Sequence, residues 1–349
     1  MTTPQRTAAA AEIGRTLDIL FDPGQVIELR RLGPKKGQVD AGYFTNREKL
    51  ITAASNSNGT VPQYIVANVV DKRLLARYNN HVEPWAATTT KDEDVTHRRW
   101  LPLEFDPDRP AGIPASNEEH AEAHERAQAC RDWLATYGWP DPVYADSGNG
   151  AWLLYRMPDL PNTDALTKKI QRVLEVAHLF YSGEKRESGI AVKIDRTVYN
   201  AARLVRLFGT ANLKGDGDEA SGREHRASYI LEAPDRTAVL TMDAIDRLLK
   251  AFPEEKDEPK NGNGHARNGM AWGKPEVEEF VTRHSLAVSY DAEYAGGHKW
   301  VLAECPFNSA HTDKSAVITI RSNGRLGFKC HHDGCAGKDW KALRGKLDP

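Results

Sequence analysis

Short apolar runs alternate with longer amphipathic segments over the first 250 residues of the chain. The two clearest helical patterns cover residues 117–138 and 163–182. The apolar runs have the length and the aromatic and β-branched content of strands, and they cover residues 24–32, 63–70, 99–105, 142–148, 151–157, 191–195 and 227–233. Because these strands and helices follow no regular repeat, the pattern predicts an α+β fold with an open mixed or antiparallel sheet flanked by helices.

One helix start is marked by capping residues. Ser116 is followed three residues later by Glu119, which is the spacing of a capping box. The pattern predicts a helix that begins at residue 117.

The pattern changes near residue 253. Residues 253–270 are charged, rich in Gly, Asn and Pro, and nearly free of large apolar side chains, which predicts a flexible linker. A helical segment at 274–286, a strand within 300–307 and a hairpin at 315–330 follow. Asn323-Gly324 is the preferred pair for a two-residue hairpin turn. We therefore expect a first domain at 1–252, a linker at 253–270 and a small domain at 271–349.

Composition narrows the class of protein. Of 349 residues, 40% are hydrophobic and 28% charged, and no apolar run approaches the length of a membrane span, which indicates a soluble, cytoplasmic protein that does not bind membranes. Glu12, Arg15 and Asp18 interrupt the early alanine run, so we expect a first helix there rather than a signal sequence. A net charge of −2 restricts any nucleic-acid contact to local basic patches.

Three of the four cysteines gather near the end of the chain. Two ligand pairs on either side of the predicted hairpin indicate a zinc-ribbon-like domain, and four protein ligands make the zinc structural. The polar stretch around the last two cysteines argues against packing as small hydrophobic residues. The predicted ligands are Cys305, His311, Cys330 and Cys335, with His331 and His332 as alternatives for the fourth position.

An acidic pair ends the predicted strand at 99–105. Glu104 and Asp106 are two residues apart and so face the same side of a strand, with Cα atoms about 6.6 Å apart. Two such carboxylates repel each other unless a cation lies between them, and a divalent metal with oxygen ligands is the natural occupant. Asp108, beyond Pro107, is expected to be a turn residue or an ion-pair partner of Arg109.

Two further stretches carry polar chemistry. Residues 147–150, Ser-Gly-Asn-Gly, predict a turn whose exposed backbone amides let a phosphate approach closely. The strand at 191–195 ends in Asp195, and Lys214 follows at some distance. Arg203 and Arg206 lie between them at a spacing of three, which on a helical turn places both guanidinium groups on one face.

From about residue 17 to residue 240, these stretches together resemble the archaeo-eukaryotic primase superfamily, specifically the primase-polymerases of phage, plasmid and mobile-element replication proteins. The family's acid-x-acid strand matches Glu104-Phe105-Asp106. Its SGNGxH loop matches residues 147–152, and its strand-end aspartate matches Asp195, followed by the basic pattern at 203–214.

The resemblance implies a DNA primase or DNA polymerase, a nucleotidyltransferase built on a sheet related to the RNA-recognition (RRM-like) fold. It implies that Glu104, Asp106 and Asp195 hold two divalent ions, Mg²⁺ or Mn²⁺. The expected partners are a single-stranded DNA template and nucleoside triphosphates. The residues that the resemblance places near nucleotide or template are Ser147, Gly148, Asn149, Gly150, Trp152, Arg203, Arg206 and Lys214.

One position departs from the family pattern. Trp152 stands where the family usually has a phosphate-binding His, and an indole has one donor and no charge. His97 or Arg99 is a candidate to take over that task. Three functions stay open: an active primase or polymerase, a weak or inactive relative that acts as a DNA-binding replication factor, and a metal-dependent nuclease. The chain has no GxxxxGK[ST] motif, so unwinding of DNA would fall to a separate helicase.

Overall fold

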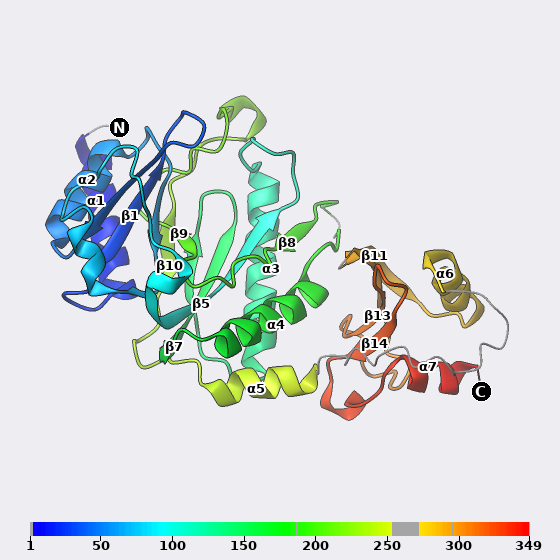
Figure 1. The fold of residues 1–349 in the computed structure, drawn as a ribbon. Helices are drawn as coiled ribbons and strands as arrows, with labels where there is room; N and C mark the ends of the chain where they lie inside the picture. Colours follow the sequence, from blue (N-terminus) through cyan, green and yellow to red (C-terminus); the bar gives the residue numbers. More distant parts are fainter. Residues whose placement is uncertain (1–2, 186–187, 253–271, 295, 349) are drawn as a thin grey trace. The chain divides into compact units, whose positions relative to one another are not determined.

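The computed structural model describes residues 3–185, 188–252, 272–294 and 296–348, drawn as a ribbon in Figure 1. The chain divides into two compact units. One comprises Met1–Tyr181 and Glu187–Ile245, and the other comprises Ser182–Arg186 and Asp246–Pro349. The predicted linker at 253–270 lies outside the described residues.

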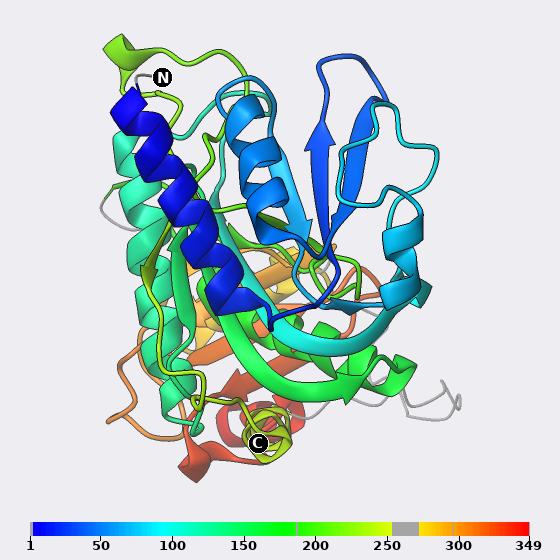
Figure 2. The ribbon, with the colours of Figure 1, turned by 90° about the vertical axis from the view of Figure 1, so that its left-hand side faces the viewer.

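The larger sheet of the first unit has six antiparallel strands. Its centre is formed by β5 (Val95–Pro107) and β7 (Ala151–Pro161), the two long curved strands of Figure 2. The path runs β10-β6-β7-β5-β4, and β8 pairs with the end of β5. The other strands are β6 (Val143–Asp146), β10 (Tyr229–Glu232), β4 (Val69–Val70) and β8 (Val192–Ile194). The prediction of an α+β fold with an antiparallel sheet is confirmed.

A second antiparallel sheet has the order β2-β1-β3-β9. Its strands are β1 (Ile27–Leu32), β2 (Val39–Phe44), β3 (Gln63–Val66) and β9 (Leu204–Arg206). The sequence pattern had not predicted β2 and β9. The β9 strand is only three residues long, too short for a period to show.

Helices cover these sheets. Contacts join α3 (Asn117–Ala135) to β5 and β7, α4 (Asp164–Tyr181) to β8, and α1 (Thr3–Leu20) to α2 (Arg47–Ser57). The predicted start of α3 is confirmed. The Glu119 amide donates a hydrogen bond to Ser116 Oγ, and the Ser116 amide donates one to Glu119 Oε2. Helix α5 covers Met242–Ala251, and short 3₁₀ turns lie at Lys72–Ala76, Asp92–Asp94, Glu219–Ser221 and Asp333–Cys335. None of the helices in the described ranges is both long and apolar enough to cross a bilayer.

The second unit is a four-stranded antiparallel sheet with two helices. Its strands follow in sequence order as β11 (Val288–Tyr294), β12 (Gly297–Leu302), β13 (Ala316–Ile320) and β14 (Leu326–Cys330), and its helices are α6 (Lys274–Arg283) and α7 (Trp340–Leu347). Its core is built from buried side chains that include Val277, Phe280, Trp300, Ile318, Phe328 and Leu343.

The hairpin turn of this unit differs from the two-residue turn that Asn323-Gly324 predicted. The Gly324 amide donates to the Arg321 carbonyl, and the Arg321 amide donates to the Arg325 carbonyl. Gly324 has a φ of +77°, so it takes the left-handed position that ends a three-residue loop. The glycine therefore serves a longer turn than expected.

Candidate active site

The three predicted acids lie at one end of the six-stranded sheet. Strand β5 carries Glu104 and Asp106, while β8 ends immediately before Asp195. Phe105 pairs with Ile194 across the two strands, and the Asp195 amide donates to the Glu104 carbonyl at 3.1 Å. Asp195 is therefore the direct cross-strand neighbour of Glu104, although the two are far apart in the chain.

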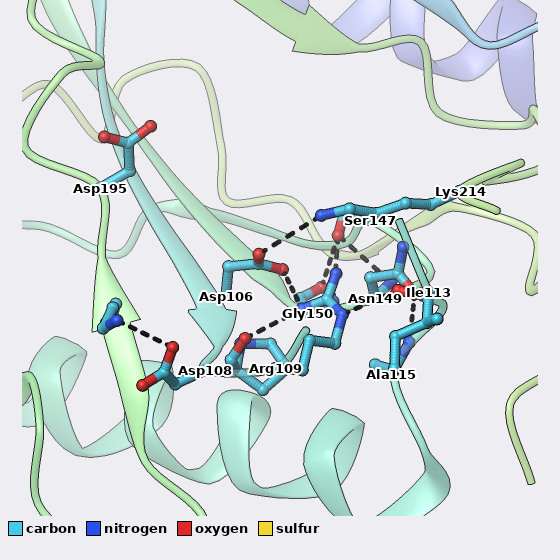
Figure 3. Close-up of polar contacts among 12 residues, drawn as sticks. Asp106, Asp108, Arg109, Ile113, Ala115, Ser147, Asn149, Gly150, Asp195 and Lys214 are labelled. Carbon is cyan, nitrogen blue, oxygen red and sulfur yellow. Dashed lines mark hydrogen bonds and ion pairs between the residues drawn. The ribbon is translucent and has the colours of Figure 1, made fainter. Parts of the chain in front are cut away.

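Each carboxylate is paired with a cationic side chain. Arg203 Nη2 lies 2.8 Å from Asp195 Oδ2 and 3.6 Å from Glu104 Oε2. Asp106 contacts Arg109 Nη1 at 2.8 Å and Lys214 Nζ at 3.8 Å (Figure 3).

In the described part of the chain, the carboxylate oxygens of the three acids do not all lie within 4.8 Å of one another. Their oxygen donors suit a hard divalent ion. Joint coordination of one ion would require the paired arginine and lysine side chains to give way.

Glu104 is electrostatically strained. Burial raises the pKa of Glu104 to about 7, and the nearby Asp106 and Asp195 carboxylates add to the rise, against the opposing charges of Arg203 and Arg206. A bound divalent cation would relieve the same repulsion. The chemistry of the donor set therefore fits a metal site.

Two clefts adjoin the acids, and both are lined by Glu104 and Asp106. The first has a volume of about 410 Å³ and the second about 570 Å³. The second also contains Asp195, Lys193 and Arg196. The first contains the predicted residues Ser147, Asn149, Trp152, Arg206 and Lys214, together with Tyr64, Arg109 and Asn212.

The first cleft contains buried cationic groups with spare donors. Arg206 is 8% exposed, its Nη2 contacts Tyr64 Oη at 3.2 Å, and its guanidinium lies 4.5 Å from the centre of the Tyr64 ring. Burial lowers the pKa of Arg206. Arg206 Nη1 and Arg109 Nη2 are buried and have no hydrogen-bond partner within the described part of the chain. Two such nitrogens in one cleft suit an anion such as a phosphate group.

Two local predictions about the basic residues are wrong. Arg203 and Arg206 do not share a helical turn, since residues 204–206 form β9 and pair with β3. Arg109 pairs with Asp106 and not with Asp108, whose partner is Lys193 at 2.8 Å. Asp108 contacts Lys193 because β8 runs alongside the end of β5, a pairing that the sequence did not predict.

The loop at 147–150 also differs from its prediction. The Gly148 amide donates to Asp146 Oδ1 at 2.6 Å, and the Asn149 and Gly150 amides donate to Ser147 Oγ. The amides are therefore used inside the protein and not exposed. A Cβ on Gly150 would lie 2.1 Å from the Phe105 carbonyl oxygen, so glycine allows the loop to pack against β5 next to the acids.

Trp152 forms part of the wall of the first cleft. It is 3% exposed and stands opposite Glu104 in the β5–β7 register. Neither candidate to replace the family's phosphate-binding histidine lies near Glu104. His97 and Arg99 precede Glu104 on β5 by about 23 and 16 Å, at about 3.3 Å per residue. Arg99 is also paired with Asp22 and Asp159.

Sequence reasoning missed Arg109 and Tyr64 as parts of the cleft. Arg109 follows Asp106 by three residues and was visible in the sequence, but its partner was misassigned. Tyr64 lies on β3 opposite Arg206 of β9, a contact that depends on a strand without a sequence signal.

The four predicted zinc ligands gather in the second unit. Cys305 Sγ lies 3.7 Å from Cys335 Sγ, and His311 Nδ1 lies 3.6 Å from Cys330 Sγ and 3.5 Å from Cys335 Sγ. A tetrahedral zinc site with Zn–S near 2.3 Å and Zn–N near 2.0–2.1 Å has edges of about 3.8 Å between sulfurs and about 3.5 Å between sulfur and nitrogen. The cluster therefore fits zinc.

The two alternative ligands lie next to this cluster. His332 Nδ1 is 3.7 Å from Cys330 Sγ, and its ring stacks on His311 with centroids 3.7 Å apart. His331 Nε2 contacts Asp313 at 3.2 Å. The four predicted ligands have all their ligand atoms within 4.8 Å of one another, and they are Cys305, His311, Cys330 and Cys335.

Solved structures similar to this chain include two primases. The AEP domain of the primase-polymerase (PrimPol) of cyanophage S-2L is 15% identical, with a TM-score of 0.39 over 68% of this chain and 95% of that domain. Primase RepB′ is 10% identical, with a TM-score of 0.39 over 68% of this chain and 61% of that chain. No protein-family model matches the sequence, and no curated protein is detectably similar to it.

Proposed function

We propose that this chain is a DNA primase-polymerase that transfers nucleotides onto a strand directed by a single-stranded DNA template. The observation that carries the proposal is the position of Glu104 and Asp106, which line both a cleft with unpartnered arginine nitrogens and a cleft that contains Asp195. One cleft suits a triphosphate and the other suits a nucleic-acid end, and the acids lie where the two would meet.

The residues that line the two clefts have different roles. Glu104, Asp106 and Asp195 hold divalent cations, Mg²⁺ or Mn²⁺, which when bound activate a 3′-hydroxyl and neutralise the triphosphate. Arg109, Arg206 and Lys214 contact the triphosphate. Trp152 supplies an apolar wall for the base or sugar, and the loop at 147–150 shapes the same wall. Lys193 and Arg196 contact the backbone of template or primer in the second cleft.

The proposed function is assigned to the first of two domains. Residues 1–252 form the catalytic domain, residues 253–270 the linker, and residues 271–349 a domain held by structural zinc. The protein serves the replication of a phage, plasmid or mobile element in the cytoplasm, and a separate helicase opens duplex DNA.

A second function has its own supporting observations. Trp152 is buried where the family's phosphate-binding histidine would stand, and arginine or lysine side chains contact all three acids. These features favour a primase-like DNA-binding replication factor without catalysis.

A single assay separates the candidates. The full-length protein is incubated with a primed or unprimed single-stranded template, nucleoside triphosphates, and Mg²⁺ or Mn²⁺. We expect template-dependent strand synthesis. Template binding without product under every metal and nucleotide would support the second function, and template degradation would indicate a metal-dependent nuclease.

Replacing Arg206 by lysine is expected to weaken nucleotide binding. Lysine keeps the charge but loses the fork whose Nη1 is free for an anion. Losing a charge-assisted hydrogen bond of about 1.5–3 kcal/mol raises the KM for nucleotide about 10- to 100-fold. Steady-state incorporation measures this, with Arg131→Lys, a surface residue paired with Asp141 and Glu232, as the control. An unchanged KM would show that Arg206 does not touch the nucleotide.

A further inference from the structure

A second cluster of metal-binding side chains lies between α3 and β6. His120 and His124 are one helical turn apart on α3, and Asp146 is the last residue of β6. Their ligand atoms lie within 4.8 Å of one another, and none of the three lines either cleft. The cluster is therefore separate from the acids and from the cysteine site.

The separations match the edges of a coordination polyhedron. His120 Nε2 is 2.9 Å from Asp146 Oδ1, His124 Nε2 is 3.6 Å from the same oxygen, and the two Nε2 atoms are 3.2 Å apart. Nitrogen and oxygen ligands at about 2.0–2.1 Å from a tetrahedral ion are about 3.3 Å from one another. The three distances lie on both sides of that edge, so an ion fits with small adjustments.

Hydrogen bonds alone leave this triangle incompletely satisfied. His124 Nδ1 lies 2.6 Å from Tyr144 Oη, and a proton donated there leaves a lone pair on His124 Nε2. A single proton on His120 Nε2 cannot point at both Asp146 and His124. A cation at the centre would accept all three lone pairs, with Tyr144 orienting one imidazole from outside.

The charge of Asp146 points the same way. Its side chain is buried, with the residue 2% exposed, and its Oδ1 accepts a hydrogen bond from the Gly148 amide at 2.6 Å. A buried carboxylate needs a cationic partner. The histidine side chains are 20% and 14% exposed, which gives an ion a path from solvent.

We propose that His120, His124 and Asp146 bind a divalent first-row transition ion, with Zn²⁺ as its representative and a fourth position left for water. Two imidazoles and one carboxylate suit this class better than Mg²⁺. The ion ties α3 to the end of β6 and fixes Asp146, whose Oδ1 accepts the Gly148 amide of the 147–150 loop. The site depends on side-chain geometry and not on polymerase activity.

The first test uses full-length protein that carries one equivalent of zinc, held by the cysteine cluster. With excess Mg²⁺ present to occupy the three acids, added Co²⁺ is expected to bind one further site and to produce d–d absorption without thiolate-to-metal charge transfer, because the ligands contain no sulfur. Absence of any second equivalent, or a charge-transfer band in its spectrum, would overturn the proposal. This measurement needs no variant and no activity.

The second test compares variants in the same titration. His120→Gln and His124→Gln are each expected to lower the second affinity at least tenfold, while His97→Gln, an exposed histidine on β5, leaves it unchanged. Full retention of the second equivalent in both variants would contradict the site and leave a hydrogen-bond network. If one glutamine variant does not fold, the titration of the other decides.

Discussion

Replacing Asp106 by asparagine is expected to abolish nucleotide incorporation, with a loss of at least about 1000-fold. Asp106 lines both clefts and contacts Arg109 and Lys214, so the change removes a metal-binding charge where both substrates meet. A loss of about 4 kcal/mol in transition-state stabilisation corresponds to this factor. Single-turnover extension of a labelled primer measures it.

Asp108→Asn is the matched control for this change. Asp108 lies two residues further along, pairs with Lys193, and lines only the second of the two clefts. We expect its rate to stay within a few-fold of the unaltered protein, and both variants to keep single-stranded DNA binding. Equal losses of rate in the two variants would mean that the loss comes from less negative charge in this region and is not specific to Asp106.

Replacing Cys330 by serine is expected to release the zinc and unfold the second unit. Cys330 is buried at the end of β14, and its Sγ lies 3.6 Å from His311 Nδ1. The metal contributes on the order of 10 kcal/mol to folding of a structural zinc unit, more than a small unit can lose. Zinc content by mass spectrometry and calorimetric unfolding of the full-length chain measure the effect.

Cys130→Ser provides the comparison for the zinc prediction. Cys130 is also a buried free thiol, but it lies on α3 in the first unit. The Cys130→Ser change should lower the stability of the first unit and leave the zinc content unchanged. Retention of zinc by Cys330→Ser, with no loss of stability, would show that Cys330 is not a ligand.

The thiol chemistry of the cysteine cluster agrees with metal binding. A hydrogen bond from Cys330 lowers the pKa of Cys305 to about 5, and the same contact raises the pKa of Cys330. Zinc binds cysteines as thiolates, so metal binding would displace the protons that these sulfurs carry without it.

Local signals in the sequence predicted much of the fold. The capping box at Ser116 predicted the start of α3 because both of its hydrogen bonds lie within four residues. Strand periodicity placed Glu104 and Asp106 on one face, and both line the same clefts. The spacing of the cysteines predicted their convergence because a hairpin joins the two ligand pairs.

Contacts between distant strands were beyond such signals. The pairing of β9 with β3, which sets Arg206 against Tyr64, depends on three residues without a period. The pairing of β8 with β5 decides that Asp108 meets Lys193 and leaves Arg109 for Asp106. The His120–Asp146 contact joins a helix to a strand end, and no spacing in the sequence predicts it.

The proposed function requires that Glu104, Asp106 and Asp195 bind divalent cations together with a nucleotide. The most direct measurement is anomalous scattering from crystals soaked in Mn²⁺ and a nonhydrolysable nucleoside triphosphate. We expect manganese bound to all three carboxylates, Arg203 released from Asp195, and phosphate oxygens within hydrogen-bond distance of Arg206. Crystals with nucleotide but no manganese at these acids, and with Arg203 still paired to Asp195, would contradict the account.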